Sequence, residues 1–314
     1  MNNKTGLSMV SLHTSSQALN FFKSWYGKTG TYPRFELSYQ SDKQYLKDIA
    51  SIKGNVLSGH IPCPQNKYLP NLGSRSSLVI QNSLETIKAS TDTVSSFGGT
   101  ILVLHAGYTT DEPVFTENRK REKKLREYEK KSLYLWLSEG SICKPGYAES
   151  DEYKIHMEIT LKNLKKAANI SMDRGIKLAV ENLNPRLTYL FQMPEDFVRM
   201  TEEIDNLYIC IDIGHLWISS LVHKYDYFEA LNILVSTGRV VTAHIHDNDS
   251  RAEGNLRFSD DHGSLGTGTV PVKESISIIA KNSSANLIIE AVSEPEKNLS
   301  MLDGIVSELN QVGL

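Results

Sequence analysis

The sequence predicts a (β/α)8 TIM barrel, and three observations lead to that prediction. Short aliphatic and β-branched runs alternate with longer segments of helical periodicity, the pattern of repeated βα units around a buried parallel sheet. Eight such units fit into 314 residues, a length that suits one barrel. Six of the runs end in a residue that can bind a metal, and a barrel gathers its strand ends at one mouth.

The expected elements follow one another in regular order. The strands are expected at 7–12, 34–38, 55–60, 100–105, 177–181, 207–212, 240–244 and 286–290, most of them short aliphatic and β-branched runs. The helices are expected at 16–26, 41–52, 75–97, 152–174, 194–204, 225–237, 272–281 and 295–312. We expect a single domain over residues 1–314.

An insertion interrupts this rhythm after the fourth strand. His105 and Glu181 are 76 positions apart, against 31 between Glu181 and Asp212. The excess lies at about 108–150 and includes ENRKREKKLREYEKKSLYLWL, a charged helix that runs into an apolar patch with Trp136. The insertion is either a lid or phosphate-attracting wall over the site, or a solvated helix with a docking edge. A solvated helix is the simpler explanation of the many charged residues in the insertion.

Composition limits the classes of partner. The chain is 40% apolar and 23% charged with a net charge of −3, so no global charge favours nucleic acid or an anionic membrane. The three cysteines are scattered and form no CxxC pair, which fits a reduced compartment. The N-terminus lacks a secretory apolar core, and no run approaches the roughly 18 apolar residues of a membrane span. We expect a cytoplasmic protein with no membrane partner; a homo-oligomer stays open.

The strand ends carry the chemistry. The six runs that end in potential ligands are VLSGH at His60, ILVLH at His105, LAVE at Glu181, ICID at Asp212, VVTAH at His244 and LIIE at Glu290. The last four form a carboxylate-rich set with one imidazole, which suits a divalent Zn, Mn, Co or Mg ion. A salt-bridge network is the alternative, but no Lys or Arg stands at the corresponding strand ends.

Further polar residues follow these strands. His215 comes just after Asp212, where a turn can bring both to one site, and DDHGSLGTG offers Asp260 and His262 between glycines that allow close approach to a ligand. His246 and Asp247 extend the run that ends at His244 and suit a supporting or substrate contact. His13 is expected near the pocket. Other residues are expected outside the site, namely Cys210 in the barrel interior, Cys63 as a bystander, and His156 and His223 on helix surfaces.

Five motifs give the chain a family resemblance. They are LVLHAG, VENLNP, CIDIGH, HIHDND and DDHGSLGTG. Over essentially its whole length the chain resembles the xylose isomerase-like TIM barrel superfamily, which includes sugar and sugar-phosphate isomerases and epimerases and the endonuclease IV class of abasic-site nucleases. In the nuclease branch nine residues bind three zinc ions, and the matching positions here are His60, His105, Glu181, Asp212, His215, His244, Asp260, His262 and Glu290. The continuation ENLNPRLTYLF is closer to the isomerases.

The resemblance implies two competing enzymes with one to three divalent ions. A sugar or sugar-phosphate isomerase or epimerase would move a proton with Glu181 and Glu290 as catalytic residues, through a metal-stabilised enediolate. Its substrate contacts would come from His105, His215, His246 and Asp247. A zinc phosphodiesterase acting on abasic DNA is the alternative, and only then is nucleic acid a partner; the one marked basic run is 119–131. A barrel that keeps its ligands only for stability or binding is the third interpretation.

Overall fold

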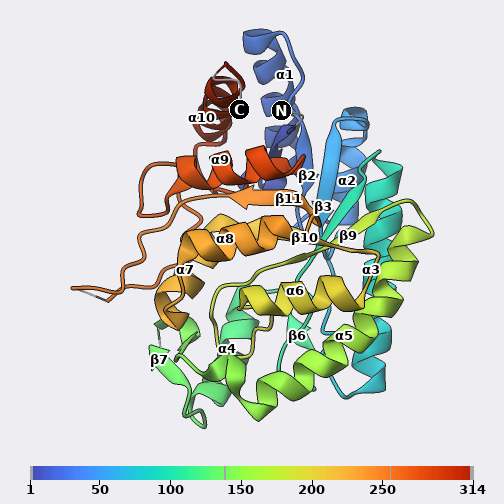
Figure 1. Cartoon of the computed structure of the whole chain (residues 1–314). Coiled ribbons are helices and arrows are strands. Elements are labelled where there is room, and N and C mark those ends of the chain that lie inside the picture. Colours follow the sequence, from blue (N-terminus) through green and yellow to red (C-terminus); the bar gives the residue numbers. More distant parts are fainter. Residues whose placement is uncertain (1–2, 138, 255, 312–314) are drawn as a thin grey trace.

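Eight parallel strands close into a barrel that is surrounded by helices (Figure 1). The computed structural model describes residues 3–137, 139–254 and 256–311. Around the barrel, neighbouring strands follow the order β1-β12-β11-β10-β9-β5-β3-β2. Their bounds are β1 Thr5–Ser8, β2 Phe35–Leu37, β3 Val56–His60, β5 Ile101–Leu104, β9 Lys177–Glu181, β10 Leu207–Asp212, β11 Val240–Ile245 and β12 Asn286–Ile289. The predicted (β/α)8 barrel is confirmed.

Helices cover the outside of the barrel. Their bounds are α1 Ser15–Thr29, α2 Lys43–Asp48, α3 Ser77–Ser96, α5 Asp151–Met172, α6 Pro194–Glu203, α7 Ile213–His223, α8 Tyr227–Ser236, α9 Val272–Asn282 and α10 Pro295–Gln311. Many begin at a side-chain cap, as Thr14 does for α1, where it accepts from the main-chain N–H of Gln17. The expected helix 295–312 ends at Gln311 in α10, and position 312 lies outside the described residues.

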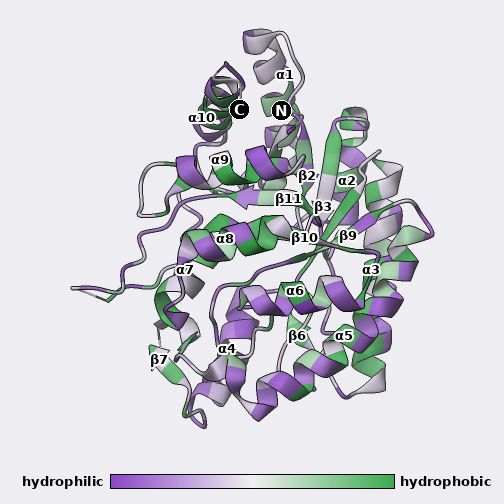
Figure 2. Cartoon of the chain, in the orientation of Figure 1, coloured by the Kyte–Doolittle hydropathy of each residue, from purple (hydrophilic) through white to green (hydrophobic). Residues whose placement is uncertain are grey.

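The core has two layers because successive strand side chains point to opposite sides. Val103, Ala179 and Cys210 form a small apolar cluster inside the barrel, as their positions two residues before the strand ends predict. The alternate residues, such as Leu104 and Val180, belong to the large cluster between strands and helices. Outer helices such as α5 alternate hydrophilic and hydrophobic residues accordingly (Figure 2).

The insertion after β5 folds onto the mouth of the barrel. It contains the charged helix α4 (Asn118–Glu129) and a two-stranded ribbon of β7 (Leu135–Leu137) and β8 (Ile142–Cys143). A second ribbon pairs β6 (Val114–Phe115) with β4 (Tyr68–Leu69), which follows β3. The insertion therefore joins the loops at the end of the barrel where the strand-end residues lie.

Two expected elements are corrected. The first strand ends at Ser8, and Met9–Ser11 form a 3-10 turn in place of the second half of the expected strand 7–12. Residues 213–223, for which the sequence predicts a connection, form α7, which starts directly after β10. No helix among the described residues is both long and apolar enough to cross a membrane.

Candidate metal centre

Glu181, Asp212, His244 and Glu290 converge at the mouth of the barrel. Glu181 and Asp212 end β9 and β10, His244 lies in β11, and Glu290 follows β12 directly. The Nδ1 atom of His244 lies 3.1 Å from Glu290 Oε2, 3.4 Å from Glu181 Oε1 and 4.0 Å from Asp212 Oδ2. One potential ligand atom from each of the four residues lies within 4.8 Å of the others. Parallel strands thus bring residues that are distant in sequence to one point.

The donor set fits a divalent cation. Three buried carboxylates surround one imidazole, and none of the three pairs with a Lys or Arg within the described residues. In the same part of the chain Nδ1 of His244, the nitrogen that faces the carboxylates, makes no hydrogen bond, so it can bind an ion. Buried charges need a counter-charge or a metal to be stable. Carboxylate oxygens with one imidazole suit Mn, Mg, Co or Zn.

The electrostatics favour ionised carboxylates at this point. Burial raises the pKa of Glu290, but the His244 and His262 imidazoles outweigh burial and bring that pKa down to about 2. For Glu181, burial again acts upward, and the His244, His105 and His215 imidazoles hold its pKa well below the usual range. Both side chains are therefore carboxylates at neutral pH, the form that binds metals and accepts protons.

Glu36 is a part of this centre that the sequence reasoning missed. It lies in the middle of β2, fully buried, with Oε1 3.0 Å from Nε2 of His244 and Oε2 accepting from the Ser58 hydroxyl at 2.7 Å. Metal-binding imidazoles are commonly oriented by a carboxylate on the far nitrogen. The available signal was a charged residue at an inward position of an apolar strand, but Glu36 does not stand at a strand end like the other candidates.

A second group meets the centre through Glu181. His60 Nε2 and His105 Nε2 lie 3.1 and 3.2 Å from Glu181 Oε2. The Nδ1 atom of His60 lies 2.9 Å from the carbonyl oxygen of Ile61, so a proton on Nδ1 would leave Nε2 as the acceptor. His60, His105 and Glu181 can together hold one further ion.

A third group lies on the other side of the centre. His215 Nε2 and His262 Nε2 approach Asp260 Oδ1 at 3.2 and 3.3 Å, and His246 stacks on His262 with ring centroids 4.0 Å apart. These four residues can also hold an ion. His215 lies in the first turn of α7, where its main-chain N–H donates to Asp212 Oδ1 at 2.7 Å. A helix start, rather than the expected turn, places His215 beside Asp212.

Asp247 lies behind the site, and His246, a member of the third group, also contacts the four-residue centre. Nε2 of His246 is 3.0 Å from Asp212 Oδ1, so this imidazole contacts the back of a candidate ligand. The Asp247 carboxylate accepts main-chain N–H groups of Asn248, Gly268 and Val270 at 2.8, 2.9 and 3.0 Å. Neither side chain lines the cavity. The position of Asp247 suits holding the loop that carries His262 better than the expected substrate contact.

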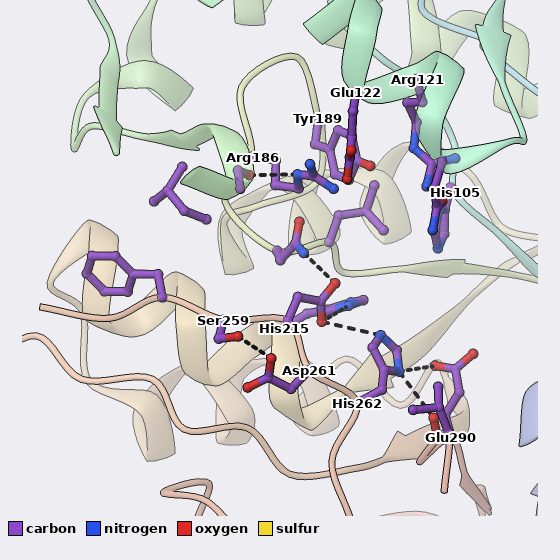
Figure 3. Close-up of a pocket in the computed structure, with 18 of the residues that line it drawn as sticks. His105, Arg121, Glu122, Arg186, Tyr189, His215, Ser259, Asp261, His262 and Glu290 are labelled. Carbon is purple, nitrogen blue, oxygen red and sulfur yellow. Dashed lines mark hydrogen bonds and ion pairs between the residues drawn. The ribbon is translucent and has the colours of Figure 1, made fainter. Parts of the chain in front are cut away.

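A cavity of about 1160 Å³ opens above the centre. Glu290 and His262 lie on one side of it, and His105, Arg121, Tyr189 and Arg186 lie on the other (Figure 3). The insertion supplies part of the wall, so it adjoins the site rather than lying away from it. The residues that line the cavity and belong to the sequence-predicted set are His13, His60, His105, Glu181, His215, Asp260, His262 and Glu290.

The remaining histidines and cysteines lie elsewhere. His156 was expected on a helix surface, but it is buried and its Nδ1 lies 2.7 Å from the carbonyl oxygen of Gly73. His223 is also partly buried, with Nε2 3.1 Å from Gln192 Oε1. The prediction of a surface residue is therefore wrong for His156, whereas His223 keeps part of its surface exposed. Cys63 is buried and does not line the cavity, in keeping with its expected role as a bystander.

The chain belongs to the xylose isomerase-like TIM barrel family, whose model matches residues 16–305. Among curated proteins it is similar to two uncharacterised proteins of Methanocaldococcus jannaschii, MJ1614 and MJ1311, at 24% identity over 130 residues and 27% over 139. These alignments cover 41% and 42% of this chain. The chain spans less than half of the length of these relatives, 45% and 43%.

Solved structures share the fold over nearly the whole chain. A D-tagatose 3-epimerase-like protein matches with a TM-score of 0.71 at 17% identity, covering 99% of this chain and 100% of the other. The 3-keto-D-glucoside 4-epimerase YcjR from E. coli matches at 0.61 and 15%, covering 98% and 99%. A Thermus thermophilus protein that was soaked with ZnCl2 matches at 0.60 and 14%, covering 98% and 99%. At these identities the likeness establishes the fold, not the reaction.

Proposed function

We propose that this protein is a metal-dependent isomerase or epimerase of a sugar or sugar phosphate. The observation that carries the proposal is the meeting of Glu181 and Glu290 at one imidazole beneath a cavity large enough for a sugar. A divalent ion bound by Glu181, Asp212, His244 and Glu290 would supply Lewis-acid stabilisation of charge that develops on substrate oxygen. The epimerases among the similar structures support this class of reaction.

The residues of the chain have distinct roles in this reaction. Glu181 and Glu290 both line the cavity, and both are ionised at neutral pH, the form in which a carboxylate can accept a proton from a substrate carbon. One carboxylate takes the proton, and the same group or its partner returns it to the neighbouring position or to the opposite face. His105 and His215 line the cavity and can donate hydrogen bonds to substrate hydroxyls.

Solvent isotope exchange tests the proposal. The metal-loaded protein is incubated in D2O with a panel of ketoses and ketose phosphates, and deuterium at the substrate carbons is followed by NMR. Proton transfer predicts incorporation at one carbon, with product of the isomerised or epimerised sugar. Absence of exchange across the panel, in protein with its full metal content, would count against an isomerase.

A second function is favoured by the two additional ligand groups. The first group is His60, His105 and Glu181, and the second is His215, His246, Asp260 and His262. Together with the four-residue centre, they give three adjacent candidate sites. Two or three zinc ions in such an array can activate water and stabilise attacking and leaving oxygens in phosphodiester hydrolysis. Cleavage of a duplex that contains one abasic site, together with two or three zinc ions per chain, would support this alternative over the isomerase.

A further inference from the structure

Among the described residues, four arginines line the cavity, and they fall into two pairs. Arg251 and Arg257 form ion pairs with Asp249 at 2.7 and 3.3 Å, and Arg257 also pairs with Asp261 at 3.6 Å, so two carboxylates compensate the two charges. Arg121 and Arg186 pair with no carboxylate among residues 3–137, 139–254 and 256–311. A guanidinium keeps its charge at any physiological pH, so the second pair brings uncompensated positive charge to the cavity wall.

Arg121 is held in place by neutral groups. It comes from the first turn of α4 in the insertion, and its Nη1 donates to the carbonyl oxygens of Phe115 and Thr116 at 3.0 and 2.9 Å, while Nη2 donates to Asn118. Neutral acceptors fix the guanidinium without cancelling its charge. Its neighbour Glu122 also lines the cavity but forms no ion pair within the described residues.

Arg186 approaches the same wall from the loop after β9. Its Nε donates to the carbonyl oxygen of Gly140 at 2.8 Å, and its guanidinium lies 5.6 Å from the centroid of the Tyr189 ring. Neither terminal nitrogen of Arg186 makes an intramolecular hydrogen bond within the described part of the chain. They are available to a bound anion.

The hydroxyl group of Tyr189 lies in the positive potential of the two arginines. Its side chain is buried, and burial alone would raise the pKa of the hydroxyl. The charges of Arg121 and Arg186 outweigh burial and lower that pKa below the ordinary value of tyrosine. A negative charge placed at this point is therefore stabilised, and Figure 3 shows the three residues on the wall that faces His262 and Glu290.

We propose that Arg121, Arg186 and the Tyr189 hydroxyl bind the phosphate group of a phosphorylated sugar whose reacting end lies at Glu181 and Glu290. The proposal rests on the proposed isomerase function and names its substrate class. Guanidinium groups match the oxygens of a phosphate with paired, charge-assisted hydrogen bonds. The cavity connects this wall with the carboxylates, so one substrate can contact both. The insertion that carries Arg121 then determines specificity.

Calorimetric titration of the metal-loaded protein tests the subsite. Ribulose 5-phosphate and ribulose form a matched pair of probes that differ only in the phosphate. Inorganic phosphate is a third probe, which separates binding of the anion from binding of the sugar. The variants are Arg121→Gln and Arg186→Gln, so that failure of one to fold leaves the other. The control is Arg119→Gln, an exposed arginine on the same helix α4 that does not line the cavity.

The expected result is a wild-type preference for ribulose 5-phosphate that falls about tenfold in each cavity variant and stays unchanged in Arg119→Gln. Ribulose affinity should not change. An equal preference in wild type and both cavity variants, or phosphate binding that is independent of both arginines, overturns the subsite. Turnover is assayed separately. Arginine-dependent phosphate binding without proton exchange would reject the isomerase but retain the subsite. Proton exchange on ribulose without a preference for the phosphate would reject the subsite but retain the isomerase.

Discussion

Glu36 and His244 face each other at the base of the site, with Glu36 Oε1 3.0 Å from His244 Nε2 and both side chains fully buried. The opposite nitrogen of the same ring faces Glu290 and Glu181. The imidazole is therefore placed between a supporting carboxylate and the candidate metal position. This arrangement fixes which nitrogen is available to an ion and makes the ring a better ligand.

Replacing Glu36 should weaken metal binding without unfolding the barrel. In Glu36→Gln the shape is kept but the carboxylate charge beside Nε2 of His244 is lost, so we expect metal affinity to fall by about 10- to 100-fold. Competition with a chelator of known affinity measures the change. Ser58→Ala, which removes only the hydrogen bond to Glu36, should have a smaller effect. Equal affinity in Glu36→Gln and wild type would deny the supporting role.

Glu290→Gln should abolish turnover and leave the fold intact. Glutamine has nearly the same volume but cannot accept the proton from a substrate carbon, and it removes a negative ligand. The measurement is deuterium exchange on the active substrate, with circular dichroism and the melting temperature as checks on folding. A fully active variant would remove Glu290 from the mechanism.

The number of ions can be assigned by residue. His105→Ala should reduce bound zinc by one ion per chain and leave the four-residue centre loaded, because His105 contacts only the group that includes His60 and Glu181. Glu181→Ala should reduce the metal content by more than one ion, since Glu181 belongs both to the group with His60 and His105 and to the four-residue centre. Elemental mass spectrometry on protein purified without chelators gives the counts. Unchanged zinc in His105→Ala would leave this residue as a substrate contact only.

His223 should make the fold sensitive to mild acid. Burial lowers its pKa from 6.5 to about 4, so between these values the unfolded chain binds more protons than the folded one. Stability from this group is therefore complete above pH 6.5 and is lost as the pH falls towards 4. His223→Gln can keep a hydrogen bond to Gln192 and removes the proton uptake.

The melting temperature at about pH 7.5 and about pH 5 measures this effect. Wild type should lose more on acidification than His223→Gln does, while the exposed His13→Gln should follow wild type. Identical losses in all three proteins would show that His223 is accessible to protons in the folded state.

Periodicity was sufficient for the barrel because a parallel strand buried on both faces leaves an unbroken aliphatic run such as LII before Glu290. The strand-end rule also placed Glu181 and Asp212 at one mouth, since parallel strands share the direction of their carboxyl ends. Periodicity failed at α7, where Ile213, Trp217 and Ile218 follow β10 without a turn. Only the Asp212 cap marks the change from strand to helix.

The sequence by itself determined which residues are aligned at one end of the barrel, because that alignment follows from strand direction and a period of two. Only the tertiary structure decided how His60, His105 and His215 divide into groups around Glu181, and that Glu36 supports His244. It also decided that the insertion brings Arg121 to the cavity wall. These relations depend on distances across the barrel and on loop packing, which local sequence patterns do not encode.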